Sequence, residues 1–409
     1  MKLGEFQAHS ADWARACTVA LGATLPFSTA LDNVLLGLIL LCWLAAGHFR
    51  AQWERLRHHP FVWTIGAFIA LLAFGLTYGE RLPGDGMHYF GKYAYLLFII
   101  IFLSLFDDPR WRRRALLAFA GSLTLLLALS YLIRFGVIPP NHWIAGTPAN
   151  PVVFKQWITH GILMAFGAYL FAVFGFQARQ PRQRATCYVL ALLAAGNVLF
   201  MMQGRTGYIV LVMLALYFGY ACRRLVGLAV AALGAGVVIA TAFVLSGTLH
   251  DRTSLALQEF QQERPGVATQ TSIGQRVEFY RNGLAIVRDH PLLGVGTGGF
   301  PAAYEKQIAG TPLAPTRNPH DEYLHILIQI GAVGLVALLA LFWVPWQMAP
   351  QLPTWREQQL ARGFVLTLAV GCVFNSLLID HTERLLFTWG LGVLFAGLQF
   401  RTAPSPPSP

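Results

Sequence analysis

Residues 107–135 read DDPRWRRRALLAFAGSLTLLLALSYLIRF, an arginine cluster followed by the stretch 115–135, in which Arg134 is the one charged residue. A helix needs about 20 apolar residues to cross the hydrocarbon core of a bilayer. Backbone groups find no water partners in that core, so a spanning run of this kind must be helical. The stretch therefore predicts a transmembrane helix with a strongly basic start.

The composition indicates that most of the chain lies in lipid. Of its 409 residues, 56% are hydrophobic and 12% are charged, whereas soluble domains carry about 25% charged residues. The net charge of +11 would suggest nucleic acid as a partner of a soluble protein, but membrane proteins collect Lys and Arg in their cytoplasmic loops. We therefore expect membrane lipids around the chain and no nucleic acid partner. The five cysteines lie in or beside apolar runs without CxxC spacing, so we expect neither a disulfide framework nor a metal site.

Further apolar runs on both sides of this stretch predict an all-α polytopic membrane protein of about twelve transmembrane helices. The first run follows a polar start, and we expect it to be a retained helix, not a cleaved signal peptide. A tight turn is expected at Asp32-Asn33, between the first two runs. The predicted spans are 16–31, 34–46, 61–77, 89–106, 115–135, 153–176, 185–202, 206–222, 225–246, 323–346, 363–378 and 385–400.

Every second connection between these runs is basic, which predicts their orientation. Cytoplasmic loops of membrane proteins carry an excess of Lys and Arg. The alternation places both termini in the cytoplasm and the other connections outside. The basic residues that set it are Arg50, Arg55, Arg57, Arg110, Arg112, Arg113, Arg114, Arg179, Arg182, Arg184, Arg223, Arg224, Arg356, Arg362 and Arg401.

The one long outer connection, 247–322, divides the chain. It is too polar to insert into lipid and too long for a simple connector, and loops of this length are usually functional. We expect helices of the membrane domain over 1–246, an outer loop domain over 247–322, the remaining helices over 323–401 and a disordered tail, rich in Pro and Ser, over 402–409.

Within the outer segment, a capping box at Ser272 and Gln275 predicts a helix over 273–288, which Pro291 keeps from continuing. Helical spacing puts Arg276 at the edge of the apolar stripe, beside Tyr280, so this guanidinium turns inward. The apolar stripe is expected to contain Ile273, Val277, Tyr280, Leu284 and Val287, with Gln275, Glu278 and Asn282 on the opposite face.

A buried guanidinium needs an anion, because burying it unpaired is costly. Two interpretations of Arg276 stay open. One is a structural ion pair with a carboxylate such as Asp380 or Glu383. The other is a ligand phosphate, which the planar fork of Arg suits.

The glycine-rich stretch 291–300, PLLGVGTGGF, lacks the GK[ST] of a P-loop and follows no strand. We interpret it as a tight turn that lets backbone pack closely.

Residues 318–324, NPHDEYL, open a late transmembrane helix and place His320 at the outer membrane interface. Asn318 is the expected N-cap and Pro319 the first helical residue. The helix N-terminus lowers the pKa of an imidazole, whereas Asp321 and Glu322 raise it. The alternatives are a base at a reaction site and an interfacial histidine that only packs or caps.

Arg205 stands in the short outer connection between the spans 185–202 and 206–222. A charge at membrane depth points to function by default, and the alternative is a side chain that snorkels to lipid phosphate. His290, at the end of the outer helix, is a weaker candidate with several structural explanations.

In order and spacing, these features resemble the bacterial O-antigen ligase/polymerase superfamily. The residues that carry the resemblance are Arg205 between two spans, Arg276 followed by 291–296, and His320 with Tyr323 and Leu324. The family often has Asn after the histidine, where this chain has Asp321. The helix count and the outer loop before the late helices are similar as well.

Within the superfamily, the single large outer loop and the short tail look most like the lipopolysaccharide O-antigen ligases. The resemblance implies a GT-C-like, inverting, metal-independent glycosyltransferase without a cofactor. It would transfer O-antigen from undecaprenyl diphosphate to a sugar hydroxyl of lipid A–core, at the periplasmic face of the bacterial inner membrane. His320 would be the general base, and Arg205 and Arg276 would bind the diphosphate. Asp321, Tyr323, Tyr280 and His290 would be supporting residues.

Other functions stay open on sequence alone. An O-antigen polymerase shares the donor but often has two sizeable outer loops, and a protein O-oligosaccharyltransferase usually has a longer C-terminal region. A lipid-linked glycan transporter would show internal repeats and polar groups at mid-membrane. The sequence contains no convincing internal repeat.

Overall fold

The computed structural model describes residues 3–141, 144, 146–245 and 272–398. It is 76% helical, and its described residues form no strand, which confirms the predicted all-α polytopic class. The part 247–271 of the predicted outer domain and the predicted disordered tail 402–409 lie outside the described residues.

The helices overlap the predicted spans. They are α1 (Leu3–Thr24), α2 (Thr29–Ala46), α3 (Phe49–Leu56), α4 (Pro60–Phe74), α5 (Asp85–Ala94), η1 (Tyr95–Leu97), α6 (Phe98–Leu105), α7 (Pro109–Arg134), α8 (Trp157–Gln177), α9 (Pro181–Met201), α10 (Arg205–Leu245), α12 (Ser272–Asp289), α13 (Phe300–Gln307), α14 (Glu322–Met348), η2 (Ala349–Gln351), α15 (Trp355–Gly371) and α16 (His381–Phe395). However, α1, α15 and α16 both begin and end earlier than predicted.

Among the described residues, seven helical segments are long and apolar enough to cross a membrane. In addition, α4 is an apolar helix that is shorter than these seven segments. The chain is therefore a multi-pass membrane protein, while the count of about twelve spans stays a prediction. The seven segments are Thr29–Ala46, Asp85–Leu105, Pro109–Arg134, Trp157–Gln177, Pro181–Met201, Arg205–Val238 and Glu322–Gln351.

The turn between the first two helices lies earlier than expected. We predicted it at Asp32-Asn33, but α1 ends at Thr24 and α2 begins at Thr29. Ser28 caps α2, its side chain accepting a hydrogen bond from the Leu31 N–H. Asp32 is fully buried in the first turn of α2 and accepts from the Thr24 hydroxyl at 2.8 Å. A serine N-cap and an acid in the first helical turn explain this register.

The predicted boundary between two spans at 222–225 is confirmed by a break inside α10. Arg223 and Arg224 leave helical geometry, and Arg224 has a φ of 52°. The two arms meet at Gly219 and Gly227, where a Cβ on Gly219 would lie 2.4 Å from the Gly227 carbonyl oxygen. Glycine is needed on both arms because the backbones touch.

A second break, in α14 at Ile330-Gly331, was not predicted. The glycine-rich stretch packs into it: the N–H groups of Val295 and Gly296 donate to the carbonyls of Ile328 and Gln329, at 2.9 and 2.8 Å. Beyond the break, Ala332 N–H donates to Pro291 at 2.9 Å. The backbone groups freed by the break are thus satisfied within the protein, which the membrane interior requires. The predicted role of the stretch in close backbone packing is confirmed.

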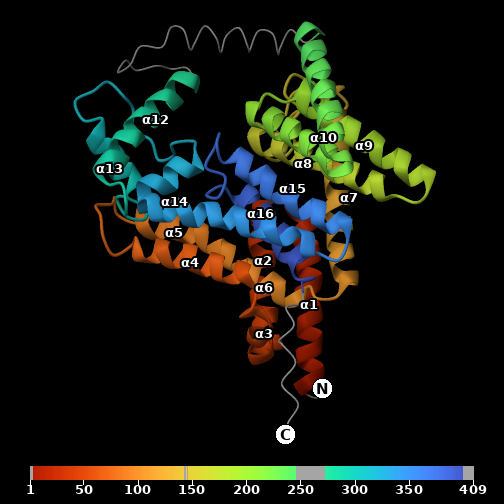
Figure 1. Ribbon diagram of the computed structural model, residues 1–409, viewed down its shortest axis with the longest axis horizontal. Helices are drawn as coiled ribbons and strands as arrows, with labels where there is room; N and C mark the ends of the chain where they lie inside the picture. Colours follow the sequence, from red (N-terminus) through yellow and green to blue (C-terminus); the bar gives the residue numbers. More distant parts are fainter. Residues whose placement is uncertain (1–2, 142–143, 145, 246–271, 399–409) are drawn as a thin grey trace.

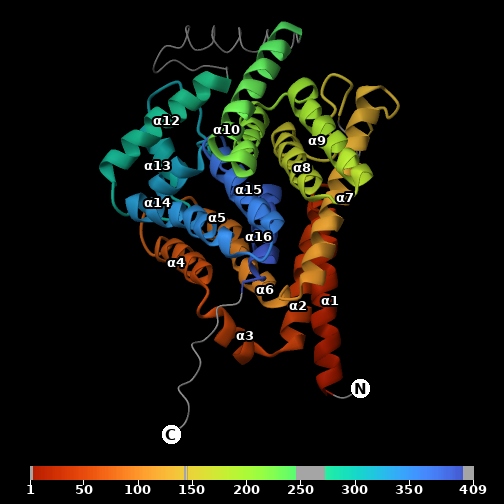
Figure 2. The same cartoon turned by 45° about the vertical axis from the view of Figure 1, so that its right-hand side comes forward.

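Figures 1 and 2 show α15 and α16 in the centre, with α4 and α14 on one side and α7 and α8 on the other. The buried core is continuous across these helices, and Trp389 at its centre donates to the Thr18 carbonyl at 2.9 Å. A smaller apolar cluster joins α12 and α13 to the first half of α14. In both views α12 and α13 lie far from the N-terminus of α1. This second cluster positions the candidate site.

Candidate functional site

His320 lies two residues before the start of α14, in a constrained backbone conformation. Its φ is 56°, in the left-handed region that residues other than glycine seldom adopt. The turn is held by Asn318, whose side-chain oxygen accepts from the His320 N–H at 2.8 Å. Backbone strain of this kind clusters at functional sites.

The predicted helix start is wrong by three residues. We expected Asn318 as N-cap, but Asp321 caps α14 by accepting from the Leu324 N–H at 3.0 Å. Pro319 lies outside the helix. Both Asn318 and Asp321 are good capping residues, and the chain uses the first for the turn and the second for the helix.

A hydrogen-bond chain of three side chains fixes the imidazole. His320 Nδ1 and Asn375 Oδ1 are 2.9 Å apart, and Asn375 Nδ2 donates to Asp380 Oδ2 at 3.0 Å. Because the amide nitrogen of Asn375 donates to a carboxylate, its oxygen faces the ring and accepts. His320 therefore carries its proton on Nδ1, and Nε2 is the nitrogen that can accept a proton.

The surroundings of His320 keep the imidazole neutral. Burial lowers its pKa, the hydrogen bond to Asn375 raises it, and the Arg276 cation lowers it; the net direction is downward from the usual 6.5. Phe279 of α12 stacks on the ring, with centroids 6.1 Å apart and planes 22° apart. A neutral, oriented imidazole can act as a base at neutral pH.

Arg276 lies on α12, partly buried and close enough to His320 to affect its titration. Burial lowers the pKa of the guanidinium, Tyr280 raises it and the charge of Arg205 lowers it. In the part of the chain that the structure describes, Arg276 forms no ion pair, so the expected structural pair with Asp380 or Glu383 is not found there.

Arg205 is exposed at the first residue of α10 and is near enough to repel Arg276. Arg276 thus lies within electrostatic range of Arg205 on one element and of His320 on another. Two cations that repel each other beside a helix N-terminus form an environment that an anion stabilises.

The expected supporting residues divide into near and distant ones. Tyr280 donates to the Val373 carbonyl at 3.4 Å, and burial and Asp321 raise its pKa while Arg276 lowers it. Tyr323 donates to the Ala369 carbonyl at 2.7 Å. His290 is exposed beyond the C-terminal end of α12, roughly 20 Å along the helix from Arg276 at 1.5 Å per residue. The structure does not bring His290 to the site.

The buried face of α12 differs from the expected one. Val277 and Leu284 are exposed at 36% and 49%, whereas Glu278 is 3% exposed. Glu278 accepts from the Asn282 amide at 3.3 Å. The partners of α12 are α13 and the first half of α14. On the side predicted to be polar, Glu278 is buried whereas Gln275 is exposed.

Two cavities adjoin the site. One, of about 590 Å³, is lined by His320, by Glu278, Phe279 and Tyr304, and by the loop 312–316. The other, of about 490 Å³, is almost wholly apolar and runs between α14 and α15 from Tyr323 to Trp346. A chamber with polar and apolar walls is therefore lined by His320. The apolar groove begins at Tyr323, three residues further along the chain.

Sequence reasoning missed Asn375. It stands with Ser376 inside the predicted span 363–378, and this polar pair was the signal that could have found it. In the structure α15 ends at Gly371, so Asn375 belongs to the connection before α16.

Comparisons with known proteins find one family match and one relative. A family model described as O-antigen ligase matches residues 189–339, which include Arg205, Arg276 and His320. An uncharacterized protein of Haemophilus influenzae is 29% identical over 79 residues, which are 18% of this chain. The match spans 20% of the length of that relative.

Proposed function

The chain belongs to the O-antigen ligase/polymerase superfamily, and on that premise we propose that it is an O-antigen ligase. It transfers O-antigen polysaccharide from undecaprenyl diphosphate to a sugar hydroxyl of lipid A–core. The supporting observation is the chain His320–Asn375–Asp380, which presents a neutral imidazole beside Arg276.

In the proposed reaction, His320 Nε2 removes the proton of the acceptor hydroxyl as its oxygen attacks the anomeric carbon of the donor. The new glycosidic bond forms as the bond from that carbon to the diphosphate oxygen breaks, on the opposite face, so the configuration inverts. A positioned base contributes about 10²–10⁴-fold to such a step. The proton stays on the imidazole until water removes it.

Arg276 and Arg205 bind the diphosphate and stabilise the negative charge that develops on it. Charge that appears in the transition state is stabilised best by groups already in place. The Arg fork pairs with phosphate oxygens in a bidentate manner. In this scheme the two guanidinium groups do what a metal ion does in other phosphoryl leaving-group chemistry.

The two cavities suit two lipid-linked substrates. The apolar groove between α14 and α15 suits a polyprenyl chain, with the diphosphate at its Tyr323 end. The chamber beside His320 carries Gln275 and Glu278 for sugar hydroxyls, and Phe279 and Tyr304 for the apolar faces of sugar rings. In the proposed orientation this region is periplasmic, the protein lies in the bacterial inner membrane, and both termini are cytoplasmic.

The test is a reaction of the purified chain with undecaprenyl-diphosphate glycan and lipid A–core, read as a lipopolysaccharide ladder. We expect His320→Ala to abolish the ladder and His290→Ala to leave it intact. A full ladder from His320→Ala would contradict the base assignment. Elongation of a lipid-linked acceptor in place of core would identify a polymerase. Transfer of glycan to a protein acceptor would identify an oligosaccharyltransferase, and transport of the glycan without transfer would identify a transporter.

A further inference from the structure

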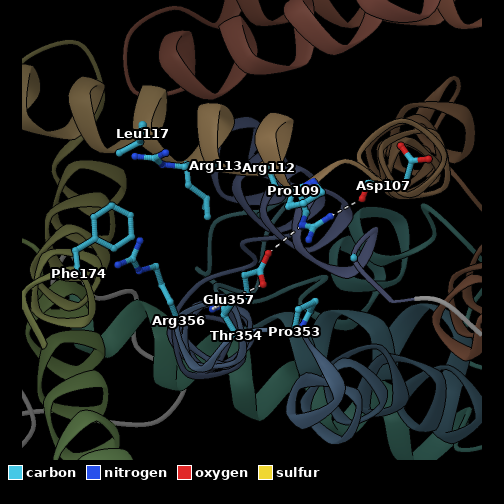
Figure 3. A pocket seen from close by; sticks show the side chains of 12 residues that line it. Asp107, Pro109, Arg112, Arg113, Leu117, Phe174, Pro353, Thr354, Arg356 and Glu357 are labelled. Carbon is cyan, nitrogen blue, oxygen red and sulfur yellow. Dashed lines mark hydrogen bonds and ion pairs between the residues drawn. The ribbon is translucent and has the colours of Figure 1, made fainter. Parts of the chain in front are cut away.

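A second charged cavity lies away from the glycan site, between the first turns of α7 and α15. Figure 3 shows it, with Arg112 and Arg113 on one side and Arg356 and Glu357 on the other. Its volume is about 560 Å³. None of its lining residues takes part in the arrangement around His320, so it needs its own explanation.

One arginine of this cavity is fully accounted for. Arg112 is 3% exposed, and its Nε lies 2.9 Å from Glu357 Oε1. It also donates to the carbonyls of Phe106 and Asp107, at 3.1 and 2.8 Å. This buried ion pair joins α7 to α15, and the charge of Arg112 is therefore not available for a ligand.

The other two arginines are less fully paired: the carboxylate that attracts Arg356 is Glu357, which Arg112 already binds. In the described part of the chain neither Arg113 nor Arg356 forms an ion pair, and the two are close enough to repel each other. The Arg356 guanidinium rests on the Phe174 ring, 5.0 Å from its centroid, and its Nε is buried without a hydrogen-bond partner. Leaving a buried donor of a charged group without a hydrogen bond costs free energy. An acceptor bound beside Arg356 Nε would remove this cost.

The helices add to the positive potential. The cavity is lined by Pro109 at the first residue of α7 and by Thr354, the N-cap of α15. Helix N-termini carry partial positive charge and bind phosphate readily. Two such ends and two unpaired guanidinium groups thus converge on one space.

One wall of the cavity is apolar and faces outward. Leu116, Leu117 and Phe174 form it, and the Leu117 side chain is 50% exposed on α7, a helix apolar enough to span a membrane. An anion that fits here has a phosphate at one end and hydrocarbon at the other. Basic pockets between transmembrane helices on the cytoplasmic side suit acidic lipid head groups.

We propose that this cavity binds one anionic glycerophospholipid, with its phosphate at Arg113 and Arg356 and its acyl chains along Leu117 and Phe174. The bound lipid bridges α7, α8 and α15. By the positive-inside pattern, it belongs to the cytoplasmic leaflet.

The test measures the thermal stability of the detergent-purified full chain as phosphatidylglycerol is added, with phosphatidylcholine and soluble glycerol phosphate in parallel. We expect saturable stabilisation by phosphatidylglycerol alone. Arg356→Gln should raise its apparent Kd by about tenfold or more, since hydrogen bonds to charged groups are the strong ones. Arg113→Gln, at an exposed side chain, tests the same phosphate without disturbing buried atoms.

Arg110→Gln is the matched control, because it removes one exposed positive charge from the same end of α7 outside the cavity. It should bind phosphatidylglycerol like the unaltered chain. Equal weakening by Arg110→Gln, equal stabilisation by phosphatidylcholine, or unchanged binding in both Arg113→Gln and Arg356→Gln would overturn the assignment. Stabilisation by glycerol phosphate alone would show a site for a small anion and not for a lipid.

Discussion

His320 and Asn375 are hydrogen-bonded at 2.9 Å although 55 positions separate them in the sequence. The contact joins the residue before α14 to the connection before α16, and Asp380 fixes the direction of the amide. An imidazole held in this way presents one defined nitrogen as a base, the arrangement by which a third group orients a catalytic histidine.

Removing this contact should lower the rate more than the affinity. We expect Asn375→Leu, which has the same branched skeleton, to reduce kcat by roughly 10²-fold, within the contribution of a positioned base, and to change donor KM little. The measurement is steady-state kinetics of glycan transfer. A parallel Asn375→Gln variant keeps the amide group. If this variant regains part of the kcat, the loss in Asn375→Leu comes from the orientation of the imidazole and not from altered packing.

The rate should depend on pH through His320. Because burial and Arg276 lower its pKa, the imidazole stays neutral until the pH falls below about 6.5, the ordinary histidine value. We expect kcat/KM to be flat near neutral pH and to fall on acidification below that value. In Arg276→Gln the cation is gone, the pKa of His320 rises, and the acidic limb of the residual rate should move to higher pH. If the acidic limb of the pH profile did not move in Arg276→Gln, Arg276 would not influence the pKa of His320.

Donor binding should depend on the guanidinium fork of Arg276. Hydrogen bonds to charged groups contribute about 1.5–3 kcal/mol, so Arg276→Ala should raise donor KM by roughly 10- to 100-fold. Arg276→Lys should recover only part, since Lys lacks the planar fork. Arg288→Ala, at an exposed position of the same helix, is the control and should leave KM unchanged. Binding of undecaprenyl diphosphate to each variant provides the direct measurement.

The break in α14 should be intolerant of a side chain. Gly331 has a φ of 64°, and a Cβ there would lie 2.2 Å from the backbone of Leu292. Left-handed backbone strain costs of order 1–3 kcal/mol, and the collision adds to it. We expect Gly331→Ala to lower Tm clearly in thermal unfolding of the purified chain. Gly66→Ala in α4 meets no atom within 4 Å, and an equal loss of Tm there would refute the explanation.

Local signals predicted much of the fold. The basic connections and apolar runs gave the class, Arg223-Arg224 marked a real break, and Pro291 marked the end of α12 closely. The turn near Asp32 was misplaced because the serine cap at 28 determines the helix start. Two capping residues three positions apart, Asn318 and Asp321, compete for one helix start, and sequence alone does not rank them.

The site was predicted only as far as individual residues. Arg205, Arg276 and His320 stood out because charges are rare in this chain, and Arg276 lies within electrostatic range of the other two. Their roles stay a proposal. The face of α12 was wrong because its burial is decided by α13 and α14, distant in sequence. Asn375 was missed for the same reason: its partner is a histidine 55 residues away.

The backbone hydrogen bonds between residues 291–296 and the break in α14 have a consequence for substrate selection under the proposed function. These contacts tie the C-terminal end of α12 to α14, the helix that follows His320. Under the proposed function, they hold the helix that carries Arg276 against the helix that follows His320 before any glycan arrives. A site rigid at its phosphate and hydroxyl positions handles features common to every polyprenyl-linked sugar. Discrimination among glycans would then rest on the walls of the chamber, so exchange of the loop 312–316 would alter which sugars are accepted and leave the reaction itself unchanged.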